Sequence, residues 1–304
     1  MPRSWHDYNK SLIQRGNLSV WITDELVEQW EAPQIKRRGA PNKYSALAIK
    51  TILELKFLFN LPLRAAQGLF QSLFSLLKID IPVPHYSTLS RRLRKLESDL
   101  KTDNSNEPIS IAIDSSGLKV YGEGEWKVRA HGYSKRRTWR KFHLGIDVNN
   151  QMICAATVTT NDFKDSEVFE DTLSQINNPI NDVMGDGAYD SKNCYETCQA
   201  INANPLFPPR AGAVIHQHGN SKAKPLARDQ AIRCIRKLGK KGWKEKSNYH
   251  RRSLAETAMF RFKKQFTAEL KSRDFNNQAN EVFLKCGILN QFAKFGLANS
   301  VAHR

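Results

Sequence analysis

The pattern of hydrophobic and polar positions favours helices in the first third of the chain. Residues 44–60 and 63–77 carry apolar side chains at spacings of three and four, which is typical of helices with one buried face. A shorter and strongly basic helix is expected over residues 87–96. The polar stretch 99–108 follows and indicates a linker. The pattern therefore predicts a helical region over residues 1–100.

After the linker, the period changes to that of strands, and a domain over residues 108–304 is expected. An apolar run ends in Asp114, before a predicted turn at Ser115-Ser116-Gly117, and a later short run ends in Asp186. The other predicted elements are strands at 118–121, 141–148 and 152–160, then helices at 166–176, 191–203 and 281–297. The fold class is thus α+β or α/β. A basic insertion is expected at about 211–248.

A further helix is predicted from Tyr249 onward. Its apolar residues are spaced by three and four: Leu254, Ala255, Ala258, Met259, Phe262 and Phe266. Arg252, Glu256, Lys263 and Tyr249 fall on a strip beside that apolar arc. One carboxylate flanked by two cations and a phenol suits a polyanionic substrate. The alternative is an ordinary amphipathic helix with solvated charges.

The charge balance points to nucleic acid. The 304 residues contain 47 Lys and Arg against 30 Asp and Glu, a formal net charge of +17. The basic third helix would complete a helix-turn-helix unit, although a helical bundle with a basic surface fits the same pattern. The candidates to enter a major groove are Tyr86, Ser87, Thr88, Arg91 and Arg94.

No run of about 18 apolar residues is present, so no membrane span is expected. The N-terminal residues lack the apolar core of a secretory signal. The cysteines are scattered without zinc spacing, and reduced thiols are the simplest account. These observations favour a cytoplasmic location.

The spacing Tyr249-x2-Arg252-x3-Glu256-x6-Lys263 matches the Y-(2)-R-(3)-E-(6)-K motif of the DDE transposases of bacterial insertion sequences. Asp114 lies in Ile-Asp-Ser-Ser-Gly-Leu-Lys, which is similar to the first block of that family. Asp186 lies in Gly-Asp-Gly-Ala-Tyr-Asp, which is similar to the second. The order of three strands, a crossover helix and a fourth strand also resembles the ribonuclease H-like core.

The resemblance implies a metal-dependent DNA transposase with Asp114, Asp186 and Glu256 as catalytic carboxylates. These hard oxygen ligands suit Mg²⁺ (or Mn²⁺), with two ions about 4 Å apart. The enzyme would nick the element's ends and join the freed 3′-OH to target DNA. Arg252 and Lys263 would hold phosphate oxygens, and Tyr249 would pack on or hydrogen-bond to DNA.

The implied partners are the terminal inverted repeats, the target DNA and further copies of the chain in a synaptic complex. The implied location is the bacterial cytoplasm, at the nucleoid. Each acid also has a structural interpretation, because Asp is common in turns and Glu on surfaces. The remaining acids Asp147, Asp165, Asp182 and Asp190 are expected to be structural. Three other functions stay open: a DNA-binding regulator, a nuclease that cuts without joining, and an inactive remnant of an element.

Overall fold

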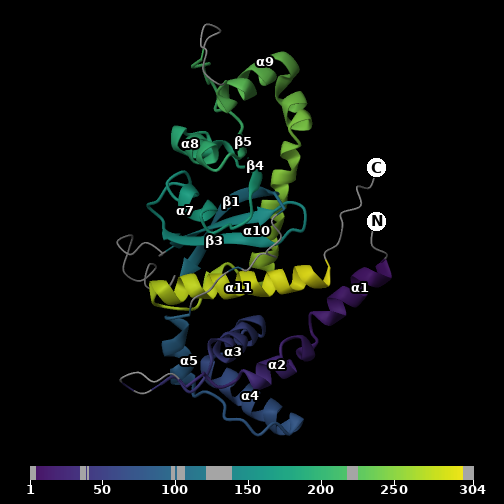
Figure 1. The fold of residues 1–304 in the computed structure, drawn as a ribbon, viewed down its shortest axis with the longest axis vertical. Coiled ribbons are helices and arrows are strands. Elements are labelled where there is room, and N and C mark those ends of the chain that lie inside the picture. Colours follow the sequence, from purple (N-terminus) through teal and green to yellow (C-terminus); the bar gives the residue numbers. More distant parts are fainter. Residues whose placement is uncertain are drawn as a thin grey trace, which may run out of the picture. The chain divides into compact units, whose positions relative to one another are not determined.

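The structure is a computed structural model, and it describes residues 5–34, 39, 41–96, 100, 107–120, 139–217 and 225–296. The chain divides into two compact units (Figure 1). The first unit consists of Met1–Asp99 together with Gln265–Arg304, and the second of Leu100–Lys264. The class is mixed α/β, with a central mixed sheet in the second unit.

The first unit is a helical assembly. Its elements are α1 (Trp5–Gln14), η1 (Leu18–Val20), α2 (Asp24–Glu28), α3 (Ala46–Leu58), α4 (Leu63–Leu77), α5 (Tyr86–Leu93), β6 (Glu269–Leu270) and α11 (Phe275–Phe295). Helix α3 begins where the Ser45 side chain accepts a hydrogen bond from the Ala48 N–H, a typical N-cap. Nine of the 13 residues of α3 are buried, because α4, α5 and α11 pack against it.

Helix α11 lies in the first compact unit, whereas the sequence pattern placed it in a domain over residues 108–304. The helix packs along α3, and its buried side chains complete the core there. They include Val282, Leu284, Cys286, Ile288 and Phe292. An apolar helix pattern shows that a face must be buried, but it does not say against which partner.

The second unit is built around a sheet. Its elements are β1 (Ile109–Val120), β2 (Trp139–Asp147), β3 (Ile153–Thr160), α7 (Phe169–Leu173), β4 (Ile180–Met184), η2 (Gly187–Tyr189), α8 (Lys192–Ala200), β5 (Asn204–Leu206), α9 (Ala227–Lys246), η3 (Tyr249–Arg252) and α10 (Ser253–Phe266), the last up to Lys264. The strand order is β3-β2-β1-β4-β5. Strands β1, β2 and β3 pair antiparallel, whereas β4 pairs parallel with β1 and with β5.

Alternation along β1 gives the sheet two different faces. Ile111 and Ile113 face a core that includes side chains of α7 and α8. The residues between and after them, Ala112 and Asp114, point to the other face. Phe142 of β2 stacks there on Phe262 of α10, with ring centroids 4.9 Å apart. Helix α10 therefore covers the face on which Asp114 lies.

Strand β1 continues through Ser115, Ser116 and Gly117, so the turn expected there is wrong. Ser115 lies opposite His143, Ser116 opposite Phe142, and Gly117 opposite Lys141 of β2. The long antiparallel partner supplies hydrogen bonds that override the local turn preference of Ser and Gly. Asp114 thus sits inside a strand and not at its end.

The helix expected over 63–77 is confirmed with the same ends, and the helix expected over 44–60 is confirmed but is two residues shorter at each end. The third begins at Tyr86 and ends at Leu93, and the helix expected over 166–176 is shorter, Phe169–Leu173. Within the described residues, no helix combines the length and apolar character needed to cross a membrane.

Candidate active site

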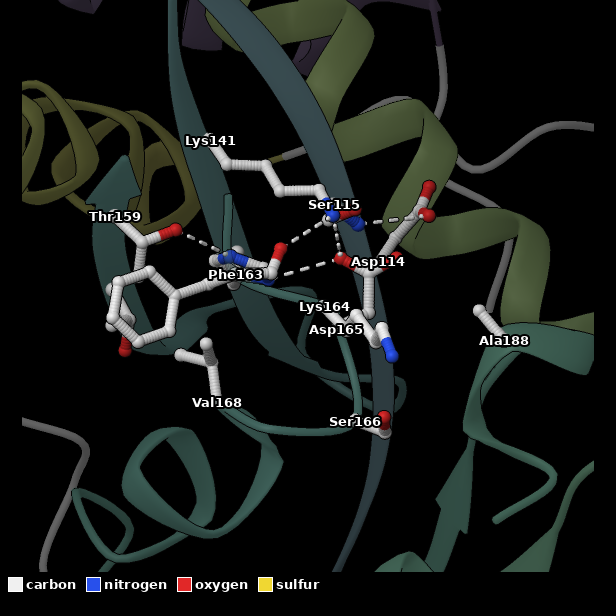
Figure 2. Close-up of polar contacts among 12 residues, drawn as sticks. Asp114, Ser115, Lys141, Thr159, Phe163, Lys164, Asp165, Ser166, Val168 and Ala188 are labelled. Carbon is white, nitrogen blue, oxygen red and sulfur yellow. Dashed lines mark hydrogen bonds and ion pairs between the residues drawn. The ribbon is translucent and has the colours of Figure 1, made fainter. Parts of the chain in front are cut away.

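Asp114 is half-buried in the middle of β1. Its Oδ1 accepts a hydrogen bond from the Ser115 backbone N–H at 2.9 Å (Figure 2). Two residues further on, the Ser116 hydroxyl contacts Nζ of Lys263 on α10 at 2.5 Å. This contact fixes α10 against the strand beside Asp114. Ser116 was not among the candidate site residues, although a period of two places it on the same face as Asp114.

Asp186 follows the end of β4 and caps the short helix η2. Its Oδ1 accepts from the Ala188 N–H at 2.8 Å, as in an N-cap. The preceding Gly185 is buried and has no room for a side chain, because a Cβ would lie 2.6 Å from the Tyr189 ring. The backbone around Asp186 is therefore closely packed.

Glu256 lies in the first turn of α10, and its side chain is largely exposed. Its Oε1 is paired with Nη2 of Arg252, four residues earlier. The residues Tyr249 to Arg252 form the 3-10 turn η3 and not the first turn of an α-helix. The polar strip was expected on one regular helix. In the structure, Tyr249 and Arg252 lie in η3, whereas Glu256 and Lys263 lie in α10.

The surroundings of Asp114 include the charges of the two other candidate acids. Burial raises the pKa of Asp114, and the negative charges of Asp186 and Glu256 raise it further. The Ser115 N–H and the Arg252 guanidinium act in the opposite direction. Three acids that are far apart in sequence therefore share one local electrostatic environment in the second unit.

Arg252 is the cation of this cluster. Burial favours its neutral form, but Tyr249, Glu256 and Asp114 outweigh burial and raise its pKa. A guanidinium at this place stays charged and offers several N–H donors in a planar fork. It therefore balances part of the negative charge that the carboxylates bring together.

Tyr249 has a different position from the one expected. Its ring is buried against Trp243 of α9, with centroids 5.1 Å apart, and its hydroxyl donates to the Gly185 carbonyl at 3.0 Å. Burial raises the pKa of Tyr249 to about 12. The expected contact of this residue with DNA does not fit a buried ring and an engaged hydroxyl. Tyr249 instead connects α9 to the residue that precedes Asp186.

The candidate carboxylates are suitable ligands for a divalent metal, but they are too far apart in this structure to share one ion. In the described ranges, no three His, Cys, Asp or Glu side chains are close enough together to hold a metal. The chemistry of Asp114, Asp186 and Glu256 is nevertheless suitable, since each carboxyl engages only one oxygen in a contact with the described residues. The buried Tyr189 hydroxyl has no hydrogen-bond partner among those residues, and its pKa is raised by burial and by nearby acids that include Asp114 and Asp186.

The acids expected to be structural have protein partners. Asp165 pairs with Lys141 at 3.0 Å and faces the buried ring of His143 at 3.4 Å (Figure 2). Burial lowers the pKa of His143 to about 4, so this ring is neutral. Asp190 pairs with Arg228 at 2.9 Å. Asp147 accepts from the Asn149 N–H, and Asp182 accepts from the Ser110 hydroxyl and the Asn204 amide.

In the first unit, the candidate DNA-reading residues have unequal surroundings. The Tyr86 ring lies under the Arg64 guanidinium at 4.7 Å, and the Ser87 hydroxyl contacts the His85 ring at 2.9 Å. Thr88 is half-buried, whereas Arg91 and Arg94 are exposed. Arg94 also comes within 3.9 Å of Asp274. The two arginines are therefore the most accessible of the five.

The expected insertion contains α9, which the sequence pattern did not resolve into a helix. Residues 218–224 of the insertion lie outside the described part of the chain. Helix α9 bends at Gly239, whose φ of +73° favours glycine. Its exposed side is cationic, with Arg233, Arg236, Lys237, Lys240, Lys241, Lys244 and Lys246. Its buried Trp243 carries the contact with Tyr249.

Comparison with known proteins gives the family of the chain. A family model described as "Transposase DDE domain" matches residues 106–291, which is more than half of the chain, and a second model of the same description matches residues 13–123. The solved "Drosophila P element transposase strand transfer complex" is similar at 11% identity with a TM-score of 0.34. That alignment covers 76% of this chain and 56% of the other, so this chain spans little more than half the length of that structure's chain.

Proposed function

Because the chain belongs to the family of transposase DDE domains, we propose that it is a DNA transposase that nicks element ends and joins the freed 3′-OH to target DNA. The observation that carries the proposal is the match of residues 106–291 to the transposase DDE domain, together with the position of Asp114 on the sheet face that is covered by α10, the helix of Glu256. The strand order and the helix across the face that bears Asp114 support a ribonuclease H-like core. An origin in a bacterial insertion sequence is part of the same proposal.

The carboxylates of Asp114, Asp186 and Glu256 would hold Mg²⁺ or Mn²⁺. When bound, such ions activate the attacking hydroxyl and neutralise the leaving oxygen of a phosphodiester. Each carboxyl group uses only one oxygen in contacts with the described residues, which supports this assignment.

The cations of the site would bind the DNA strand. Arg252 is held at the cluster by Glu256, and its remaining N–H groups suit phosphate oxygens. Lys263 reaches the Ser116 hydroxyl beside Asp114, where an incoming phosphate would compete for its ammonium group. Tyr249 would act as a positioning residue, through Gly185, and not as a DNA contact.

The rest of the DNA would be bound by basic surfaces in both units. The exposed Arg91 of α5 and Arg94 directly after it support a helix-turn-helix role for the first unit, with Tyr86, Ser87 and Thr88 at the start of the same helix. The cationic side of α9 supports phosphate binding by the second unit. A synaptic complex of several copies of the chain would hold two element ends and the target DNA.

The decisive experiment compares Glu256→Gln with the wild-type protein in a nicking and joining assay with and without Mg²⁺. The variant keeps the size of the side chain and removes its negative charge, so cleavage should be lost while DNA affinity stays within a few-fold. The matched control is Glu196→Gln, an exposed carboxylate of α8 that is paired only with Lys192. It should retain full activity.

Each outcome has a distinct meaning. Full cleavage by Glu256→Gln would refute the assignment of this carboxylate. Nicked DNA without joined products from the wild-type protein would indicate a nuclease of the same fold. DNA binding with no metal-dependent cleavage would indicate a regulator or an inactive remnant.

A further inference from the structure

A small cationic cavity lies in the first unit and is lined by none of the residues of the proposed active site. Its volume is about 70 Å³, room for about two water molecules or one small tetrahedral anion. The side chains that line it include the ammonium groups of Lys56, Lys271 and Lys285, and the polar side chains of Asn60, Gln265 and Thr267. Lys56 and Lys285 are buried, whereas the four other residues are exposed. The cavity is thus a pit with a buried cationic floor and a polar rim.

The one carboxylate in this group of charges already has its partners. Glu281 is fully buried and accepts from Lys285 Nζ at 2.7 Å, from the Lys271 N–H at 3.1 Å and from the Ser272 N–H at 2.9 Å. These donors lower the pKa of Glu281 although burial acts to raise it. Glu281 therefore balances Lys285 and leaves the other two lysines in excess.

Lys56 is the cation without a counterpart. Only 8% of the residue is exposed, and its ammonium group forms no salt bridge with another of the described residues. Its Nζ lies over the Phe57 ring, 3.8 Å from the ring centroid. Burial lowers the pKa of Lys56 to about 8; Glu281 opposes this shift, and Lys285 and Lys271 add to it. Three lysine side chains at one cavity, with one carboxylate among them, are unfavourable unless an anion joins them.

The rim of the cavity is held in an uncommon backbone conformation. Asn60 has φ of +57° and Thr267 has φ of +64°. A left-handed conformation costs little for Asn but is rare for a β-branched residue such as Thr. The packing that imposes it places the Asn60 amide and the Thr267 side chain at the mouth of the cavity, together with Lys271, which hydrogen-bonds to Asn60.

We propose that this cavity is a binding site for a phosphate-type oxyanion, held by the ammonium groups of Lys56, Lys271 and Lys285. The amides of Asn60 and Gln265 and the hydroxyl of Thr267 supply neutral donors for the remaining oxygens. The same chemistry accepts a free phosphate ion or one phosphodiester of the DNA backbone. The site uses none of the residues assigned to strand cleavage, so it stands independently of the proposed function.

Thermal unfolding of the full chain tests the site with inorganic phosphate as the probe, against chloride at equal ionic strength and pH. A ligand that binds only the folded state raises Tm with the logarithm of its concentration. Wild type and the control Lys294→Met, which removes an exposed lysine of α11, should show a phosphate-specific rise of a few degrees. Lys56→Met, which keeps the length of the side chain, should lose this rise.

A second variant, Lys271→Met, changes only the rim and should reduce the rise without abolishing folding. Absence of a phosphate-specific rise in wild type, or an undiminished rise in Lys56→Met, would overturn the proposal.

The source of the phosphate is decided by DNA binding to a fixed duplex at several salt concentrations. If a DNA phosphodiester occupies the cavity, Lys56→Met lowers the salt slope by about 1 and saturating DNA abolishes the phosphate-specific rise. If free phosphate is the ligand, the variant binds DNA like wild type, and the rise persists in the presence of DNA.

Discussion

The hydrogen bond from Tyr249 to Gly185 gives a direct test of how the active site is positioned. The Tyr249→Phe variant removes one hydroxyl and keeps the buried ring stacked on Trp243. It leaves the buried Gly185 carbonyl without its donor, and this residue directly precedes Asp186. We expect the loop that carries Asp186 to lose its fixed position.

The magnitude follows from the burial of both partners. A buried carbonyl deprived of its donor costs about 1–3 kcal/mol. If that loss falls on the position of Asp186 in the transition state, the cleavage rate drops by roughly 5- to 150-fold. The hydroxyl is neutral over the working pH range because the pKa of Tyr249 is raised to about 12, so the pH profile of cleavage should keep its shape.

The assay measures single-turnover nicking together with DNA affinity. A positioning role predicts slower nicking with unchanged affinity. A direct DNA contact by the hydroxyl predicts weaker binding instead. A variant that matches wild type in both nicking rate and DNA affinity would refute the reasoning. The hydrogen bond would then not be needed to position Asp186 for cleavage.

Other substitutions test the packing behind the site and the buried charges of the first unit. Gly185→Ala places a Cβ 2.6 Å from the Tyr189 ring and should lower the free energy of unfolding by about 1–3 kcal/mol in urea. Gly187→Ala is the control, because its Cβ would meet only the Pro208 carbonyl at 3.8 Å; equal effects of the two would contradict the argument. Burial raises the pKa of Glu54 from 4.5 to about 7, so its contribution to stability is lost as pH rises from about 4.5 through about 7. Glu54→Gln should therefore be more stable than wild type above pH 7 by at most about 3 kcal/mol. Near pH 4.5 the two proteins should have the same free energy of unfolding. A difference that does not depend on pH would exclude ionisation of Glu54 as its cause.

The hydrophobic and polar pattern of the sequence by itself determined many of the helices and strands. The apolar spacing over residues 44–60 and 63–77 specified α3 and α4, since a helix that must bury one face repeats every three to four residues. The strands that carry Asp114 and precede Asp186 followed from short apolar runs. The spacing from Tyr249 to Lys263, taken with the two aspartates, already predicted which side chains would form one site.

Tertiary structure decided how these pieces are used. The strand β1 runs past Asp114 because β2 pairs with it, although Ser and Gly alone favour a turn. Helix α11 joins the first unit because α3 offers the complementary apolar surface. The Tyr249 hydroxyl donates to the carbonyl of Gly185, which is remote in sequence. Lys56 likewise lines one cavity with Lys271 and Lys285. A residue's own sequence neighbours fix its conformational preferences, but burial, hydrogen-bond partners and charge coupling depend on which distant segments the folded chain brings to it.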